Sequence, residues 1–209
     1  MARRKSYMKT EEEEKQKETP NSPPGIMRKA FIGSIILCVI SGSTYFIYEQ
    51  MWLFSMSITF GTIAFHLGIR YLSPVILYFL FHKKYNYENV WFRQKSWEPG
   101  IYQFLKVKTW KSHILSYNAD EFSMKKHSLE EIVNNMCHAE AVHELVILLG
   151  FLSLLAAIPF GAFSVFFITA VIAGAAECIF VILQRYNRPR VVKLLNKQNE
   201  SAINRRKSR

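Results

Sequence analysis

Apolar residues form two long blocks that charged residues hardly interrupt. The first block contains an uncharged stretch of 19 residues, Ala30 to Tyr48, and continues from Met51 to Ile69 after a two-residue link. The second block runs from Leu145 to Leu183 and is divided by Pro159-Phe160-Gly161, a sequence typical of a turn. Because a helix rises about 1.5 Å per residue, each half of each block can cross the hydrocarbon core of a bilayer. The pattern predicts an all-α integral membrane protein with two transmembrane helical hairpins, about four spans.

Residues 70–81 extend the first block beyond its second crossing. Arg70 interrupts the apolar run, and Ser73-Pro74 is expected to bend the chain after it. Arginine reaches toward headgroups more readily than it stays at the bilayer midplane, so we place residues 70–81 at the membrane interface. We therefore expect a first hairpin with an interfacial piece over residues 30–81 and a second hairpin over residues 141–183.

The charges lie mainly at the two ends of the chain. There are 27 Lys+Arg against 16 Asp+Glu, and the net charge of +11 comes from residues 1–29 (+3) and residues 184–209 (+8). The acidic run and proline cluster within residues 1–29 predict a disordered tail, and residues 184–209 are expected to form a basic tail. An uncharged stretch of 32 residues from Leu145 to Ala176 excludes a soluble enzyme, a soluble nucleic-acid-binding domain and a disulfide-stapled secreted module.

The placement of Lys and Arg also predicts the orientation. The short links at 49–50 and 159–161 contain none, whereas there are eight in residues 1–29, nine in residues 82–140 and nine in residues 184–209. Basic residues are retained on the cytoplasmic side, so we expect both termini and the central segment in the cytoplasm and the protein in the cell membrane. A cleaved signal sequence at Ala30 to Tyr48 is the weaker alternative, because a long tail with an acidic run precedes it.

The central segment, residues 82–140, mixes aromatic and basic residues. It holds Trp91, Trp97 and Trp110 interleaved with lysines, a mixture that suits the headgroup layer. Pro99 fits the first turn of a helix, and apolar residues from Ile101 to Ile114 recur at helical spacing. We predict a cytoplasmic, interfacial helical segment that joins the hairpins, with a surface lining a substrate site as the alternative. Nucleic acid is not an expected partner, because transmembrane spans flank the segment.

A second helix of interest is predicted to begin at Ser128, which has the capping-box spacing to Glu131. Glu140, His143 and Glu144 then share one face where this helix enters the membrane. A neutral histidine beside a carboxylate is the arrangement of a general base, so His143, oriented by Glu140, is a candidate for deprotonating a hydroxyl. The structural alternative is that the two carboxylates form salt bridges to Lys or Arg. The spacing fits neither a zinc nor a di-iron motif, so no metal is expected.

Glu177 lies inside the fourth predicted span, eight residues before Arg185. An unpaired carboxylate in lipid costs about 2.5 to 3.5 kcal/mol, so Glu177 is expected to have a partner, with His143, Arg70 and Arg185 as candidates. A structural lock between helices and a catalytic role are both open for this residue.

Three arginines, Arg185, Arg188 and Arg190, follow within six residues at the end of this span. Arginine binds phosphate or carboxylate with two parallel hydrogen bonds, and Pro189 is expected to rigidify the strand that presents these side chains. Ordinary anchoring by positive charge on the cytoplasmic side is the alternative.

Three short blocks together resemble a known family. They are Trp110-Lys111-Ser112-His113-Ile114-Leu115, the Ala139-Glu140-x-x-His143 stretch, and Gln184-Arg185-Tyr186-Asn187-Arg188-Pro189-Arg190. In this order, over about residues 91–195, they are similar to the glycosyl-4,4'-diaponeurosporenoate acyltransferases of staphyloxanthin-type carotenoid synthesis. The resemblance implies transfer of a fatty acyl group from acyl-CoA or acyl carrier protein to a sugar hydroxyl of a glycosylated terpenoid or another membrane glycolipid, without a cofactor. The family positions present here are Lys111, Glu140, His143, Arg185, Asn187, Arg188 and Arg190.

The sequence thus favours a membrane acyltransferase in which His143 and Glu140 are catalytic. Substrate binding is assigned to Arg185, Asn187, Arg188, Arg190, Lys111 and Trp110. A non-catalytic lipid-binding or scaffold protein is the first alternative, and a small transporter suggested by Glu177 is the second. Four short helices enclose little polar space, so a homo-oligomer is left open.

Overall fold

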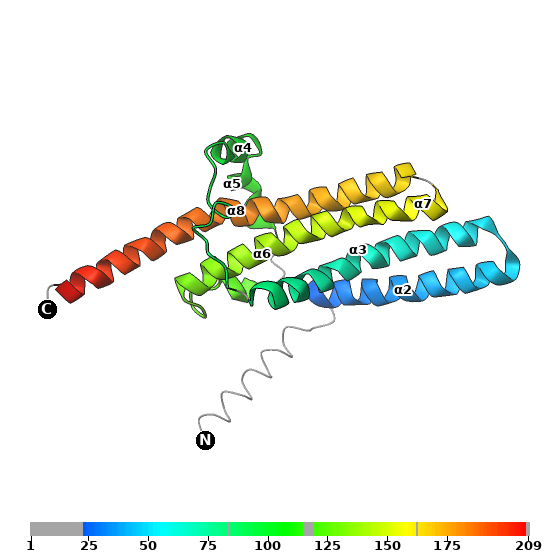
Figure 1. Ribbon diagram of the computed structural model, residues 1–209, viewed down its shortest axis with the longest axis horizontal. Coiled ribbons are helices and arrows are strands. Elements are labelled where there is room, and N and C mark those ends of the chain that lie inside the picture. Colours follow the sequence, from blue (N-terminus) through cyan, green and yellow to red (C-terminus); the bar gives the residue numbers. More distant parts are fainter. Residues whose placement is uncertain (1–22, 83, 115–118, 162, 208–209) are drawn as a thin grey trace, which may run out of the picture. The chain divides into compact units, whose positions relative to one another are not determined.

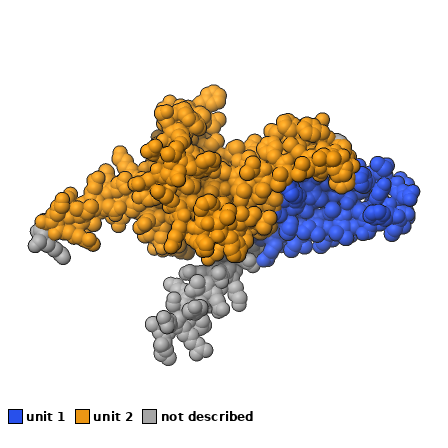
Figure 2. Space-filling view, in the orientation of Figure 1, with its two compact units in different colours: residues 1–68 blue, residues 69–209 orange. Residues whose placement is uncertain are grey.

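The structure is a computed structural model that describes residues 23–82, 84–114, 119–161 and 163–207, and the regular elements in these ranges are all helices (Figure 1). Of the tail predicted to be disordered, residues 1–29, the first 22 lie outside the described residues, and residues 23–29 are helical as part of α2, so the prediction is wrong for them. Four helical stretches are long and apolar enough to cross a membrane, which confirms the all-α fold class of a multi-pass membrane protein. They are α2 (Pro23–Tyr48), α3 (Met51–Phe81), the stretch from Leu129 to Phe160, and α8 (Phe163–Lys207). The chain divides into two compact units, residues 1–68 and 69–209 (Figure 2).

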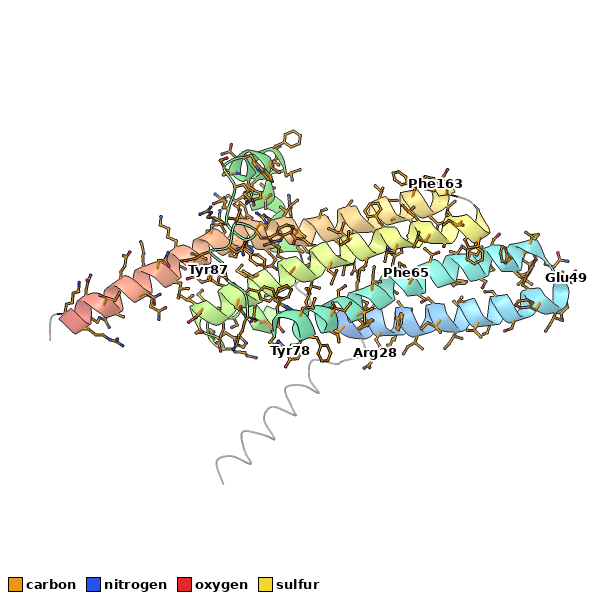
Figure 3. All side chains as sticks on the ribbon, viewed as in Figure 1. Arg28, Glu49, Phe65, Tyr78, Tyr87 and Phe163 are labelled. Carbon is orange, nitrogen blue, oxygen red and sulfur yellow. The ribbon has the colours of Figure 1, made fainter. Side chains whose placement is uncertain are left out.

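In the first unit, α2 and the first part of α3 are antiparallel and joined at Glu49, which is labelled in Figure 3 and has a positive φ of 53°. Small residues bring the two helices close together. Ser57 Oγ donates a hydrogen bond to the carbonyl of Cys38 at 3.1 Å, and a Cβ on Gly61 would lie 3.4 Å from Cys38 Sγ. Helix α2 starts at Pro23, before the expected span, because proline is well suited to a first helical turn.

Helix α3 runs without a break from Met51 to Phe81 and contains Pro74. The chain therefore stays helical over residues 70–81. Transmembrane helices tolerate proline where a neighbouring hydroxyl bonds to backbone carbonyls, and Ser73 Oγ donates to the carbonyl of Ile69 at 2.7 Å. The depth of residues 70–81 in a bilayer stays a prediction.

The second unit is built on two antiparallel helical stretches that pack side by side (Figure 1). The first consists of α6 (Leu129–Gly150), η3 (Phe151–Ala156) and α7 (Ala157–Phe160). The predicted capping box is confirmed, because the amide of Glu131 donates to Ser128 Oγ at 3.2 Å while Glu131 Oε2 accepts from the amide of Ser128 at 2.8 Å. The predicted turn is confirmed at Gly161, whose φ of 70° and ψ of −152° suit glycine.

Helix α8 extends over 45 residues, from Phe163 to Lys207, and passes through Pro189. The expectation of a strand around Pro189 is therefore wrong. The segment stays helical because Arg185 and Arg188 lie one turn apart on the face toward α6, where both are bound by carboxylates.

In the described part of the segment between α3 and α6, the helices are short. These are α4 (Glu98–Phe104), α5 (Val107–Trp110), η1 (Lys111–His113) and η2 (Ala119–Phe122). Proline in the first turn of α4 confirms the predicted helix start. The expected apolar helix ends early, because Lys106 has a φ of 49° and separates α4 from α5. Trp91 and Trp97 are exposed, as expected of residues that face headgroups, but an interfacial position stays a prediction.

Candidate active site

Charged side chains inside the second unit lie between α6 and α8. Glu140, His143 and Glu144 share a face of α6, as the sequence predicts, and Glu140 and His143 form polar contacts with α8. Glu177 and Arg185 on α8 receive these contacts. The polar groups form two adjacent sets, which we call the charge cluster and the His143 pair.

The charge cluster consists of Glu98, Glu140, Arg185 and Arg188. Glu140 has no exposed surface and accepts hydrogen bonds from Arg185 Nη1 at 2.6 Å and from Arg188 Nη1. Arg185 also donates from Nε and Nη2 to Glu98 Oε1, at 3.0 and 2.5 Å. The acids and bases alternate, so each buried charge has a partner of opposite sign.

The loop before α4 completes the hydrogen bonds of the charge cluster. Arg185 Nη1 donates to the carbonyl of Trp91 at 3.1 Å, and Arg188 Nη2 donates to the carbonyl of Phe92. The indole of Trp91 donates to Glu144 Oε2 at 2.8 Å, so the loop is bonded to α6 as well as to α8. Both guanidinium groups are therefore already occupied, which leaves Arg185 and Arg188 few donors for a substrate. Glu140 forms the salt bridges to arginine that the structural alternative predicts, and its catalytic role stays a prediction.

Glu98 was not predicted to belong to any site. It is almost fully buried, and Tyr102 donates to its Oε2 at 2.7 Å. Burial opposes ionisation of Glu98, but hydrogen bonds from Arg185, Tyr102 and the backbone outweigh it and hold the pKa of the carboxyl below its ordinary value. Burial and the bond to Glu98 raise the pKa of the Tyr102 hydroxyl. The signal in the sequence was weak, because an acid before a proline is common at helix starts.

The His143 pair, His143 with Glu177, joins α6 to α8 about one helical turn along α6 from Glu140. His143 Nδ1 lies 2.6 Å from Glu177 Oε2, and a carboxylate only accepts, so Nδ1 donates. Arg70 forms an ion pair with Glu177 Oε1, without the geometry of a hydrogen bond. The ring of Phe180 stacks on the imidazole with centroids 4.8 Å apart and an interplanar angle of 10°.

This arrangement corrects one assignment and confirms another. The carboxylate bound to His143 is Glu177, not Glu140, because Glu140 is turned toward the two arginines. The prediction that Glu177 needs a partner is confirmed, with His143 and Arg70 as the partners among its three candidates. The imidazole Nε2 has no hydrogen bond to any described residue, and the side chain is 24% exposed, so this atom can meet a substrate.

Lys111, Asn187 and Arg190 gather around Tyr186, and we call this group the basic cluster. Arg190 Cζ lies 4.1 Å and Lys111 Nζ 5.0 Å from the centroid of the Tyr186 ring. Lys111 Nζ also donates to Asn187 Oδ1 at 3.1 Å. Trp110 does not share these contacts, because its indole donates to the carbonyl of Leu105 at 2.8 Å.

A further pair was missed by the sequence analysis. The hydroxyl of Tyr85 lies 2.9 Å from Nδ1 of the buried His138. Burial, with a contribution from Cys137, raises the pKa of Tyr85 to about 12. The described residues contain no group of three or more His, Cys, Asp or Glu side chains placed to hold a metal ion.

The family model described as glycosyl-4,4'-diaponeurosporenoate acyltransferase matches residues 88–197, more than half of the chain. The chain belongs to this family. Neither the curated proteins nor the solved structures compared with it contain a significant match.

The matched range identifies which parts of the fold this acyltransferase family shares. The charge cluster, the basic cluster, His143 and Glu177 all lie within residues 88–197. Arg70 and the whole first unit lie outside it. The family likeness therefore rests on α4 to α8.

Proposed function

We propose that the protein is a membrane acyltransferase that moves a fatty acyl group onto a sugar hydroxyl of a glycosylated terpenoid, as in carotenoid synthesis of the staphyloxanthin type. The acyl donor is a thioester, carried by coenzyme A or by acyl carrier protein. Membership of the family supports the reaction class. The observation that carries the mechanism is the 2.6 Å contact of His143 with Glu177 beside an unbonded Nε2.

His143 acts as the general base in this proposal. As the acceptor oxygen attacks the carbonyl carbon of the thioester, its proton passes to Nε2 of His143. The tetrahedral intermediate then collapses, the carbon–sulfur bond breaks, and the imidazolium returns the proton to the leaving thiolate. An ester and a free thiol result.

Glu177 is the positioning residue of the pair. Its hydrogen bond to Nδ1 fixes the tautomer that presents a lone pair at Nε2, and its negative charge stabilises the imidazolium that forms. Arg70 offsets the charge of Glu177, and Phe180 fixes the plane of the ring. Glu140 acts through the fold and not on the substrate.

The site is proposed to face the cytoplasm, with both termini on that side. The concentration of Lys and Arg in residues 82–140 and 184–209, and their absence from the links at 49–50 and 159–161, supports this orientation. Thioester donors are made in the cytoplasm, so the orientation and the donor agree.

Mass spectrometry of lipids tests the proposal. Membranes from cells that make the glycosylated terpenoid are compared with and without the protein, and with His143→Gly or His127→Gln. His127 is a half-buried histidine that lies outside the site and pairs with a carboxylate, Glu131, at 3.7 Å, so its replacement serves as a control. We expect a lipid heavier by one fatty acyl group in cells with the intact protein or with His127→Gln, and not in cells with His143→Gly or without the protein.

Chemical rescue separates a catalytic histidine from a structural one. Added imidazole should restore part of the activity of His143→Gly, because it can occupy the space left by the side chain and accept the proton. Identical lipid profiles with and without the protein, when the strains that express it hold equal amounts in the membrane, would refute acyl transfer and favour the lipid-binding scaffold. Loss of activity without rescue would remove His143 as the base.

A further inference from the structure

The basic cluster of Lys111, Tyr186, Asn187 and Arg190 is not used by the chemistry at His143. It lies where η1 meets α8, so two segments far apart in the chain bring its cations together. Both cations contact the same ring: Arg190 Cζ at 4.1 Å and Lys111 Nζ at 5.0 Å from its centroid.

The two cations lack the carboxylate partners that the charge cluster has. Among the described residues, no acid forms a salt bridge with Lys111 or Arg190. The other contact of Lys111 is with the neutral Asn187 at 3.1 Å. Two like charges beside one ring repel each other, and an anion bound between them removes that repulsion.

The surroundings hold the cluster in place without neutralising it. Tyr102 packs edge-on against the Tyr186 ring, with centroids 5.3 Å apart and an interplanar angle of 89°. Tyr186 and Arg190 are four residues apart on α8, so the helix itself presents them on one face. Arg190 is exposed and Lys111 half-buried, so the charged groups remain open to a ligand from outside.

Arg185 and Arg188 cannot bind an anion without giving up a salt bridge. An anion on Arg185 or Arg188 would have to displace Glu98 or Glu140, both buried. Lys111 and Arg190, which form no salt bridge with a described residue, are therefore better placed to bind an anion than Arg185 and Arg188.

We propose that the basic cluster is a phosphate-binding site, and that its ligand is the phosphate-bearing carrier of the thioester donor. This inference rests on the proposed function for the choice of ligand. Arg190 supplies paired N–H donors, Lys111 supplies a point charge, and the Asn187 amide supplies an uncharged donor suited to phosphate oxygens. A lipid headgroup phosphate is the other source of the same chemistry.

Direct binding of coenzyme A to the full chain tests the site. The protein is placed in nanodiscs of phosphatidylcholine, and binding of labelled coenzyme A is measured by equilibrium dialysis, with pantetheine, which lacks phosphate, as the competitor. Arg190→Gln and Lys111→Gln should each weaken binding about tenfold, the scale of one hydrogen bond to a charged group. Pantetheine should compete poorly.

Arg206→Gln is the matched control. It removes one arginine charge from the same helix, about 24 Å along the axis from Arg190 at 1.5 Å per residue. Its affinity should stay within twofold of the intact protein, on the scale of ordinary surface substitutions. Equal affinities for Arg190→Gln, Lys111→Gln and Arg206→Gln, or equal binding of pantetheine and coenzyme A, would overturn the inference.

Nanodiscs containing phosphatidylglycerol distinguish the two sources of phosphate. If the site holds a headgroup, anionic lipid should compete with coenzyme A in the intact protein and not in Arg190→Gln, which supports a phosphate site but assigns it to lipid. The inference and the proposed function fail separately. If coenzyme A binding depends on Arg190 but the protein shows no acyl transfer, the phosphate site is supported and the proposed function is refuted. If the protein transfers acyl groups but Arg190→Gln binds coenzyme A as well as the intact protein does, the phosphate site alone is refuted.

Discussion

Replacing Glu140 with glutamine tests whether the charge cluster stabilises the fold. Glutamine keeps the size of the side chain but removes the negative charge shared by Arg185 and Arg188. Arg185 would retain Glu98, whereas Arg188, only 3% exposed, would be left in contact with uncharged groups, among them the carbonyl and ring of Phe92 and the Cys137 thiol. One buried guanidinium is then left without a counter-charge, which costs about 3 to 5 kcal/mol. That is a large part of the roughly 5 to 15 kcal/mol that stabilises a typical protein.

Unfolding of the purified protein by titration with dodecyl sulfate measures this loss, with tryptophan fluorescence as the signal. Glu144→Gln is the matched control, because Glu144 lies one turn further along α6 and accepts a hydrogen bond from Trp91 alone. That control should cost about 1 kcal/mol. The double variant Glu140→Gln with Arg188→Gln should lose less free energy of unfolding than the sum of the losses of the two single variants, because no unpaired charge remains.

Two results would refute this reasoning. One is equal stability of Glu140→Gln and Glu144→Gln, which would mean that the arginines find other partners. The other is an intact fold in Glu140→Gln with acyl transfer abolished, which would return Glu140 to the chemistry and remove Glu177 as the carboxylate that serves His143.

Four further substitutions test Glu98, Tyr102 and two glycines. The folded-state pKa of Glu98 lies below its ordinary value of 4.5, so its ionised form stabilises the fold above about pH 4.5 and this stabilisation is lost as the pH falls through the folded-state pKa. Thermal unfolding of Glu98→Gln should therefore depend less on acid pH than that of the intact protein, and parallel curves would contradict this. Tyr102→Phe should cost about 1 to 2 kcal/mol in the same assay at neutral pH, because a buried carboxylate loses a donor, and no change would exclude a role for the 2.7 Å bond. Gly161→Ala should lower the free energy of unfolding by about 1 to 3 kcal/mol through its backbone angles alone, since no atom lies within 4 Å of an added Cβ. Gly33 lies inside a helix with the same open space, so Gly33→Ala should raise the free energy of unfolding by about 0.5 to 1 kcal/mol. Equal effects of the two substitutions would show that the turn tolerates alanine.

The long helices could be predicted because their signals are local. Runs of apolar residues fix the spans, the pair Ser128 and Glu131 fixes the start of α6, and Gly161 fixes the turn before α8. The break at Lys106 could not be predicted, since the apolar spacing from Ile101 to Ile114 suits one helix. The path of the chain there depends on tertiary contacts, such as the bond from Lys111 Nζ to Asn187 Oδ1 on α8.

The residues of the site could be predicted better than their pairing. Glu140, His143 and Glu177 were all selected because an ionisable group in a span needs a partner. Spacing of three along α6 favoured Glu140 as the partner of His143, but residues on one face of a helix both point toward the neighbouring helix and not toward each other. The register between α6 and α8, which places Glu177 opposite His143, depends on packing along the whole interface.

The charged groups of the second unit need partners from the loop before α4 and from the last part of α3, as well as from α6 and α8. Glu98, Glu140 and Glu177 are matched by Arg70, Arg185 and Arg188, so the six groups are neutral together. Arg70 is the member of the six that lies outside the family range of 88–197. Arg70 forms the ion pair with Glu177, the carboxylate that also bonds to His143. The contacts of the His143 pair therefore depend on a residue of α3 as well as on the residues within the family range.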